Sequence, residues 1–260
     1  PYFIQYIGND VNTEMKDLIK NSLYKKAILN CNYHGFESND LKLRFKKFFN
    51  INENLSVLYR GIDVCSYKFN FPKDDKIKII YLGGFPVYDK NLVRDNTKGG
   101  YTFIDALTFL KERKIKISVK ICGPNTSVIS DDLIEFIDST IKIENLEMIS
   151  HDRVKKELSI SNIVVIPSNS EGLPNVLWQS LATGNLVIGS NVGGIPEILK
   201  INKCGIIFQK NNSIELANKI ELFSKKPYDI LPFAKRARKV VEDFSNENFI
   251  NKNFEILKKI

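Results

Sequence analysis

Two charged side chains lie beside stretches that could bind a negatively charged ligand. Lys98 comes directly before the glycine pair 99–100, and Glu171 lies in a turn-rich loop that ends at Pro174. Pro174 suits the start of a helix, because its missing N–H would have no partner there. The free N–H groups of such a helix start, at residues 172–176, favour anions and polar oxygens. The carboxylate of Glu171 could also accept hydrogen bonds from hydroxyl groups.

Each of these residues also has an ordinary structural interpretation. Lys98 could be one surface lysine among many in a lysine-rich chain. Glu171 could have a purely structural role, because the dipole of the following helix stabilises a nearby carboxylate by ~0.3–1 kcal/mol. Gly172 and Pro174 could mark no more than a turn and a helix start.

The residues around Glu171 predict a strand, a helix and a second strand. The run 163–166 is apolar and β-branched, the helix extends from Pro174 to about Thr183, and 186–189 is again apolar. Gly184 is typical of a left-handed helix end. Strand, helix and parallel strand form a βαβ unit, and its ligand site lies beyond the carboxyl ends of the strands. We therefore expect Glu171 and Gly172 at a binding site.

The same alternation of strands and helices covers most of the chain. Six strands that alternate with helices predict an α/β fold with a doubly wound parallel sheet. We expect strands at 77–82, 117–122, 146–150, 163–167, 186–189 and 205–208, and helices at 100–113, 131–140, 153–160, 174–183, 195–200, 213–224, 230–243 and 246–258.

The residues before this sheet predict a smaller and incomplete α/β unit. Three strands and two helices are few for a stable doubly wound domain, so we interpret residues 1–67 as the back half of a larger one, in a chain whose true N-terminus lies elsewhere. A polar stretch with Pro72 follows and is typical of a linker. We expect strands at 2–7, 27–31 and 55–59, helices at 14–24 and 38–49, and domains at 1–67, 68–245 and 246–260, the last a terminal helix.

The composition limits the kinds of partner. The 260 residues carry a net charge of +8, with lysines spread along the chain. This charge indicates either a solvated surface or an anionic partner, such as a phosphorylated substrate or an acidic membrane surface. A basic stripe with interleaved aromatic residues is absent from the sequence, which argues against nucleic acid.

The cysteines and histidines argue for a cytoplasmic protein without a structural metal. Four separated cysteines, with no C-x-x-C pair, predict reduced and buried thiols. Only two histidines are present, which argues against a histidine-rich metal site. We expect neither a signal peptide nor an apolar run of the ~20 residues that span a bilayer.

One run of residues carries a specific family resemblance. The sequence PSNSEGLPNVLWQSLATGNLVIGSNVGGIPEIL, residues 167–199, combines an E-G pair at Glu171, a small-residue helix end, a strand, and G-G-x-P-E ending at Glu197. Together with weaker signals, this order of motifs resembles the retaining glycosyltransferases of family 4, which have the GT-B fold. The resemblance covers essentially the whole chain. The weaker signals are Leu82-Gly83, Lys98-Gly99, Ile121-Cys122-Gly123 and Tyr59-Arg60-Gly61-Ile62-Asp63.

The resemblance implies two Rossmann-like domains that face each other across a cleft. The first would bind the acceptor, the second a nucleotide diphosphate-sugar, and the last helix, with Phe249, Phe254 and Leu257 as apolar anchors, would cross back to the first domain. Metal is not implied; Asp74-Asp75 lies in the linker and lacks the spacing of a D-x-D motif.

The resemblance also implies roles for individual residues. Glu171 would orient the donor sugar, and Lys98 would stabilise the leaving diphosphate. Asp10 lies near the place of a His or Asp that faces the reacting sugar, although it could equally form an Asx turn. Ile149 would pack on the base and Ser150 would bind its edge. The further donor-binding positions are Gly83, Gly84, Gly123, Gly172, Leu173, Pro174, Asn175 and Gln179.

Two positions depart from the family pattern. The second Glu of the pair, implied to hold the ribose hydroxyls, falls on Gln179, which can still form hydrogen bonds but carries no charge. The Arg after the first strand's Gly falls on Gly84. Arg94, in the long loop 85–97, could supply that lost cation.

The resemblance thus implies a retaining hexosyltransferase that uses a UDP-sugar and needs no metal. Its acceptor would be a glycan or a lipid-linked glycan in surface polysaccharide synthesis, with peripheral contact to an anionic membrane surface. A non-catalytic GT-B relative, acting as a partner or scaffold subunit, is the alternative, which Gln179 and Gly84 motivate. A nucleotide-sugar epimerase or dehydrogenase would need G-x-G-x-x-G after the first strand of the sheet, and that motif is missing there.

Overall fold

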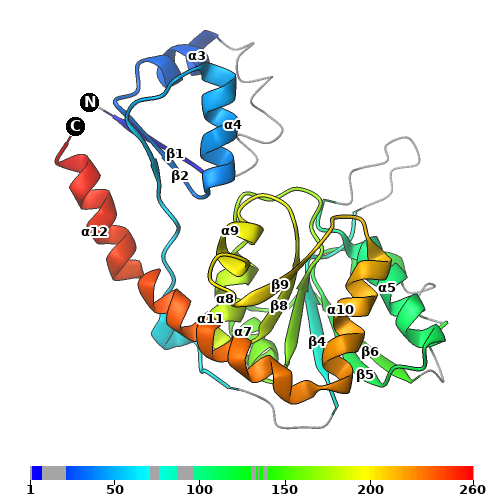
Figure 1. Cartoon of the computed structure of the whole chain (residues 1–260). Helices are drawn as coiled ribbons and strands as arrows, with labels where there is room; N and C mark the ends of the chain where they lie inside the picture. Colours follow the sequence, from blue (N-terminus) through cyan, green and yellow to red (C-terminus); the bar gives the residue numbers. More distant parts are fainter. Residues whose placement is uncertain are drawn as a thin grey trace.

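The chain forms two parallel sheets with helices packed against them (Figure 1). This computed structural model describes residues 2–7, 22–70, 76–86, 97–129, 133, 135–136 and 140–259. One sheet has three strands and the other has six, and all neighbouring strands run parallel. The α/β class and the doubly wound parallel sheet predicted from the sequence are confirmed.

The larger sheet has the strand order β6-β5-β4-β7-β8-β9. Counted in chain order from its first strand this is 3-2-1-4-5-6, the order of dinucleotide-binding folds, whose ligand crevice lies between the first and fourth strands. Here that switch point lies between β4 and β7. The strands are β4 (Lys78–Leu82), β5 (Ile117–Cys122), β6 (Ile141–Glu147), β7 (Ile163–Ile166), β8 (Leu186–Ser190) and β9 (Gly205–Phe208).

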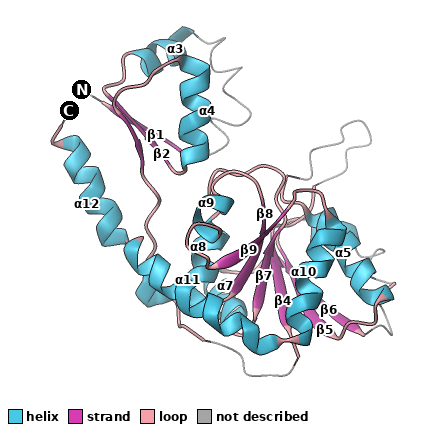
Figure 2. Ribbon diagram, in the orientation of Figure 1, coloured by secondary structure: helices cyan, strands magenta, loops and turns pink. Residues whose placement is uncertain are grey.

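Helices cover both faces of the larger sheet (Figure 2). Side chains in a strand alternate between the two faces of the sheet. In β4, Ile79 and Tyr81 belong to one buried cluster and Ile80 to another, so both faces are covered. A strand that is buried on both faces must be apolar throughout, which explains the continuous runs of β7 and β8. The helices are α5 (Gly100–Glu112), α7 (His151–Ser159), α8 (Asn175–Thr183), α9 (Ile195–Leu199), α10 (Ser213–Lys225) and α11 (Leu231–Asp243), with short 3-10 turns at Thr126–Ile129 and Pro227–Ile230.

The smaller sheet has the strand order β1-β2-β3, and the described residues of this unit include the helices α3 and α4. Its core is mainly aromatic, with Tyr6, Phe36 and Phe45 in mutual ring contact. The α4 helix begins as predicted, since the Ser38 hydroxyl accepts a hydrogen bond from the backbone N–H of Leu41. The elements are β1 (Phe3–Tyr6), α3 (Ser22–Leu29), β2 (Tyr33–Phe36), α4 (Asn39–Phe49) and β3 (Leu55–Val57), followed by a 3-10 turn at Val64–Ser66.

Two strand predictions were wrong. The run 27–31 ends helix α3, and the strand comes later, at Tyr33–Phe36, because a short apolar run fits either structure. The strand expected at 146–150 is Ile141–Glu147. It lies at the edge of the sheet, where alternate residues face solvent, so its charged residues concealed it. The helix expected at 131–140, and residues 14–21 of the one expected at 14–24, lie largely outside the described residues.

The last helix, α12 (Asn246–Leu257), leaves the larger sheet and runs toward the smaller one (Figure 1). Its start contacts the chain near Ile62, which forms a β-bridge with Ser245. Of the expected apolar anchors, Phe249 is half-buried, whereas Phe254 and Leu257 are 58% and 57% exposed, so that part of the prediction was wrong. The domain boundaries themselves stay a prediction. Among the described helices, none combines the length and apolarity that crossing a bilayer requires.

Candidate functional site

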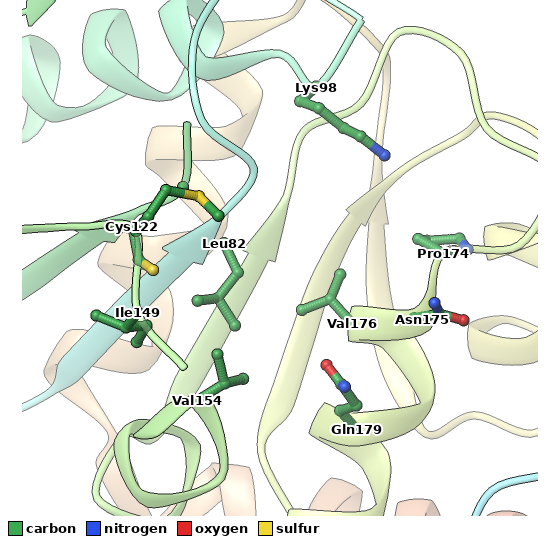
Figure 3. A pocket seen from close by; sticks show the side chains of 11 residues that line it. Leu82, Lys98, Cys122, Ile149, Val154, Pro174, Asn175, Val176 and Gln179 are labelled. Atoms are coloured by element: carbon green, nitrogen blue, oxygen red, sulfur yellow. The ribbon is translucent and has the colours of Figure 1, made fainter. Parts of the chain in front are cut away.

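A pocket of about 350 Å³ opens at the switch point of the larger sheet (Figure 3). We call it the switch-point pocket. It lies where β4 and β5 end and where α7 and α8 begin, which is the position expected for a ligand in this fold. Its lining residues are Leu82, Lys98, Cys122, Gly123, Met148, Ile149, Val154, Pro174, Asn175, Val176 and Gln179.

One wall of the switch-point pocket is apolar. Leu82 and Cys122 are the last residues of β4 and β5, Ile149 precedes α7, and Val154 lies in the first turns of that helix. In Figure 3 these side chains lie together, opposite α8. Such a surface suits a flat ring. Ile149 was predicted to lie here, whereas no binding role was assigned to the side chains of Leu82, Cys122, Met148 and Val154.

The opposite wall is polar and is formed by the start of α8 and by Lys98. Pro174 is the N-cap of α8, so the helix begins one residue later than predicted, and Pro174 has no side-chain group that could cap it. The first N–H groups of α8 therefore face the pocket region without a side-chain cap, as in anion-binding helix starts. The Lys98 ammonium reaches toward Pro174 (Figure 3).

Lys98 and Glu171, which are 73 residues apart in the chain, are in direct contact. The Lys98 Nζ atom lies 2.7 Å from Glu171 Oε1, and the Ser168 hydroxyl donates to the same oxygen at 2.8 Å. The Glu171 side chain is only 10% exposed, whereas that of Lys98 is 48% exposed. A partly exposed ion pair of this kind contributes only about 0–1 kcal/mol to stability. Its position at the ligand crevice is therefore better explained by binding than by folding.

Two glycines bring these loops close together. Gly99 has φ +69°, and a Cβ atom there would lie 1.8 Å from the Pro167 carbonyl oxygen. Gly193 has φ +54°, and its Cβ would lie 2.2 Å from the carbonyl oxygen of Glu171. Only glycine fits a backbone at positive φ and this close approach. The Lys98 turn thus packs on the end of β7, and the G-G-x-P-E motif supports the Glu171 loop.

Gln179 belongs to a hydrogen-bonded group with His151 and Tyr67, two residues to which the sequence analysis assigned no role. Its Nε2 atom lies 3.2 Å from His151 Nε2, and the Tyr67 hydroxyl lies 3.3 Å from the same ring nitrogen. Burial raises the pKa of Tyr67, so its hydroxyl stays protonated at neutral pH. These contacts direct the amide of Gln179, whose oxygen reaches into the pocket beside Val176 (Figure 3). No local sequence signal links residues 67, 151 and 179, so only the fold could reveal this group.

Three glycines that were predicted to bind the donor follow the ends of β4 and β5, close to Lys98. Gly83 follows β4 and donates its N–H to the Cys122 carbonyl, and Gly84 and Gly123 both have positive φ. A Cβ atom on Gly84 would lie 2.4 Å from the Pro124 carbonyl oxygen. The backbone at this position therefore excludes the arginine that the family pattern has there. A hollow of about 250 Å³ beside Gly83 and Gly84 shares Lys98 with the switch-point pocket.

Other predicted residues make structural contacts, and their binding roles stay predictions. The Ser150 hydroxyl caps α7 by accepting from the Arg153 N–H, because the strand ends before residue 148 and the helix begins at 151. The Leu173 side chain is buried in the core, since it packs against Gly194. The Gly172 carbonyl accepts from the Gly194 N–H at 2.7 Å. Asp10 and Arg94 lie outside the described residues.

A second cavity is lined by Glu171 itself. We call this space of about 550 Å³ the interface cavity, because residues of α4 and loops of the larger sheet both line it. Most of its lining residues are polar or charged, unlike those of the switch-point pocket. The ion pair thus joins two spaces of different character, since Lys98 lines one and Glu171 lines the other. The lining residues are Asp40, Arg44, Asn169, Ser170, Glu171, Asn191, Val192, Gly193, Pro196, Gln209 and Lys210.

The cysteines differ from the expectation of four buried thiols. Cys122 and Cys204 are buried, and burial raises the pKa of Cys204 to about 11, so that thiol stays protonated. Cys65 is exposed and Cys31 is half-buried, because both lie in the less densely packed smaller unit and its connection. Over the described ranges, no three or more His, Cys, Asp or Glu residues cluster closely enough to hold a metal ion.

The sequence of residues 72–242 matches the family model described as glycosyl transferases group 1. This match covers more than half of the chain. The chain belongs to this family. Its parallel sheets and its switch-point pocket are those of the Rossmann-like GT-B fold, as expected.

Similar proteins agree with this membership. The chain is 33% identical over 217 residues to a putative colanic acid biosynthesis glycosyltransferase, WcaL, of Salmonella typhimurium. The aligned region covers 79% of this chain and 51% of that protein. The chain is 28% identical over 170 residues to the Escherichia coli protein of the same name, which covers 62% of the chain and 41% of that protein. The chain thus spans about half the length of these relatives.

A solved structure shows a similar fold over the whole chain. The crystal structure of Anabaena Alr3699/HepE in complex with UDP superposes with a TM-score of 0.79 and 16% identity, covering 100% of this chain and 72% of that one. At this identity the likeness concerns the fold alone. This group 1 glycosyl transferase chain therefore shares its architecture with a UDP-binding protein.

Proposed function

We propose that the protein transfers a sugar from a UDP-sugar to a glycan or lipid-linked acceptor, with retention, as members of glycosyltransferase family 4 do. The Lys98–Glu171 contact at the switch-point pocket is the observation that carries this proposal. The relatives named for colanic acid biosynthesis support a role in surface polysaccharide synthesis. Alr3699/HepE in complexes with UDP and with UDP-glucose supports the choice of donor.

The two walls of the pocket suit the two ends of a nucleotide diphosphate. The base would pack on Leu82, Ile149 and Val154, and the ribose hydroxyls would bond to Gln179. The diphosphate would then reach Lys98 and the N–H groups at the start of α8, which favour anions. The sugar would lie against Glu171, whose remaining oxygen lone pairs can accept from its hydroxyls.

The reaction needs stabilisation of the leaving group. The bond between the anomeric carbon and the diphosphate oxygen breaks, and the electron pair leaves with the diphosphate. A bond forms between that carbon and the acceptor oxygen, whose proton passes to the leaving diphosphate. The Lys98 ammonium and fixed backbone N–H groups would stabilise the developing negative charge. We therefore propose that no metal is required.

The interface cavity is our candidate for the acceptor side of the reaction. It is lined by Glu171, whose partner Lys98 lines the switch-point pocket, and its amide, carboxylate and cationic side chains suit a hydroxyl-rich or anionic acceptor. The net charge of +8 supports peripheral contact with an anionic membrane surface from the cytoplasmic side.

Calorimetry and a transfer assay test this function together. The wild type and Glu171→Gln are titrated with UDP in EDTA and then assayed for release of UDP from UDP-glucose and other UDP-sugars. We expect both proteins to bind UDP, and we expect the variant to lose at least 100-fold in turnover. Failure of the wild type to bind UDP or to turn over any UDP-sugar would contradict the proposal.

A non-catalytic role as a partner or scaffold subunit is the second candidate. It is favoured by Gln179, which carries no charge, and by Gly84, whose backbone excludes an arginine. Gln179→Glu distinguishes the two. Activity that appears only in this variant would support the scaffold role, whereas activity in the wild type would exclude it.

A further inference from the structure

Glu197, the last residue of the G-G-x-P-E motif, makes its contacts with the opposite unit. It lies in the first turn of α9, beside the larger sheet. Its carboxylate accepts hydrogen bonds from the backbone N–H groups of Asn39 and Asp40 at 2.9 and 2.8 Å, and from the Tyr59 hydroxyl at 3.0 Å. All three donors belong to residues 39–59, more than 130 positions away in the chain.

This carboxylate completes the cap of α4. Asn39 and Asp40 are the first two residues of that helix, and the third N–H, of Leu41, is bonded by Ser38. A negative charge at a helix start gains from the dipole, and hydrogen bonds to a charged acceptor are stronger than neutral ones. Burial and the charge of Glu197 raise the pKa of Tyr59 far above neutrality, so its hydroxyl keeps the proton that it donates. The cap of α4 is therefore shared between the two units.

The same segment supports the loop of Glu171. Gly194 donates its N–H to the Gly172 carbonyl, and Gly193 lies directly against the Glu171 carbonyl. Only Ile195 and Pro196 separate this glycine pair from Glu197. Movement of α4 away from Glu197 would therefore release one side of the segment that holds Glu171 in place.

A neighbouring contact extends the interface to α8. Arg60 pairs with Glu37 at 2.7 Å and donates to the Asn175 side chain at 2.8 Å, at the start of α8. Arg60 thus connects the smaller unit to the start of α8, which lines the switch-point pocket, and Glu197 connects it to the segment that supports the Glu171 loop. Asp40 and Arg44, on the capped helix, then form one wall of the interface cavity.

We infer, on the basis of the proposed function, that Glu197 is a positioning residue for sugar transfer. It holds α4 against the Glu171 loop and so fixes the shape of the interface cavity in which the acceptor meets the donor sugar. Glu197 does not itself bind UDP, whose groups lie in the switch-point pocket. Loss of this carboxylate is therefore expected to impair turnover far more than nucleotide binding.

The test compares Glu197→Ala and Glu197→Gln with Glu221→Ala. Glu221 is the control, because its carboxylate also accepts a hydrogen bond from a residue far away in the chain, Arg113, but within the larger unit and outside both cavities. UDP affinity is measured by calorimetry and turnover with a UDP-sugar. The separation of the units is measured by pulsed electron resonance between spin labels on Leu43→Cys and Ile201→Cys, both exposed positions, with Cys31 and Cys65 replaced by Ser.

We expect Glu197→Ala to keep UDP affinity within twofold, to lose at least tenfold in kcat and to broaden the distance distribution. Glu197→Gln, which keeps the shape but loses the charge, should change in the same direction by less and serves if the alanine variant does not fold. Glu221→Ala should change none of the three quantities. A wild-type distance distribution in both Glu197 variants would overturn the inference, and this measurement needs no ligand, so it stands apart from a failure of UDP binding. Unchanged kcat in both variants would overturn it as well.

Discussion

The two sheets differ in how completely they are buried. Every residue of β7 and β8 in the larger sheet is buried, whereas β3 of the smaller sheet is only half-buried throughout and β1 is buried only at Tyr6. A strand covered on both faces can anchor loops whose positions are well defined. The larger sheet accordingly carries the ion pair and the switch-point pocket.

The smaller sheet contributes by contact with those loops. It places α4 and the Tyr59–Arg60 segment against Glu197 and Asn175, but the described part of this unit supplies no lining residue to the switch-point pocket. We therefore interpret the larger unit as the donor-binding part and the smaller unit as a wall of the acceptor side. Changes in the first should affect nucleotide binding, and changes in the second should affect stability or turnover.

The largest contrast is expected between two glycines, one in each unit. A Cβ atom on Gly99 would meet the Pro167 backbone at positive φ, whereas one on Gly35 of β2 would meet only the ends of the Leu58 and Phe3 side chains. We expect Gly99→Ala to lower the free energy of unfolding by about 3–5 kcal/mol, and Gly35→Ala by about 1–2 kcal/mol. Urea unfolding of both variants measures this difference. Equal losses would contradict the close approach assigned to Gly99.

The next contrast is between two lysines that each pair with a carboxylate. Lys98→Ala should weaken UDP binding by about 10- to 100-fold, because a hydrogen bond to a charged group contributes about 1.5–3 kcal/mol. Lys225, which pairs with Glu221 at the end of α10, is the control, and Lys225→Ala should bind UDP within twofold of the wild type. Calorimetry at constant salt checks both. Equal affinities for all three proteins would remove Lys98 from the site.

Acid should affect the smaller unit through His34. This imidazole is 2% exposed, bonded to Tyr6, and its burial lowers the pKa to about 4. The unfolded chain, with a histidine pKa near 6.5, then binds more protons, so stability falls as pH drops from about 6.5 to 4. At pH 5 the loss relative to neutral pH is at most about 2 kcal/mol.

Urea unfolding at pH 7 and pH 5 measures this loss. In His34→Phe, which keeps an aromatic ring in the cluster with Phe45, the fall between the two pH values should be smaller. The same fall in both proteins would mean that His34 is not the group responsible.

The smallest effect concerns Gln179. Gln179→Leu should weaken UDP binding by about 2- to 10-fold, because one net hydrogen bond contributes about 0.5–1.5 kcal/mol. Comparison with 2′-deoxy-UDP sharpens this test. The wild type should prefer UDP, and the variant should lose that preference if the amide bonds to the ribose. An unchanged ratio of the two affinities would place Gln179 elsewhere on the nucleotide.

The parts of the fold that could be predicted are those buried on both faces. The strand β7 is a continuous apolar run and β4 is apolar after Lys78, so their pattern is visible without a structure. The edge strand Ile141–Glu147 was misplaced because solvent on one face permits charges. The run 27–31 was assigned to the wrong type of element because a few apolar residues do not distinguish a helix end from a strand.

The site shows a similar division. Lys98 and Glu171 could both be proposed for the site in advance, because the family resemblance implies a donor-binding role for each. Their direct contact became visible only in the structure. Apart from Ile149, the apolar wall could not be predicted, since Leu82 and Val154 resemble any other core residues in the sequence. Glu197, His151 and Tyr67 act through contacts over long separations in the chain, which no local spacing encodes.

The most direct test of the central claim is a crystal structure of the protein with UDP-glucose bound. We expect the diphosphate within about 3 Å of Lys98 Nζ and a glucose hydroxyl at hydrogen-bond distance from the Glu171 carboxylate. We expect the uracil on the wall formed by Leu82, Ile149 and Val154. Nucleotide density at another surface, with the Lys98–Glu171 pair intact and the switch-point pocket holding only solvent, would contradict the account.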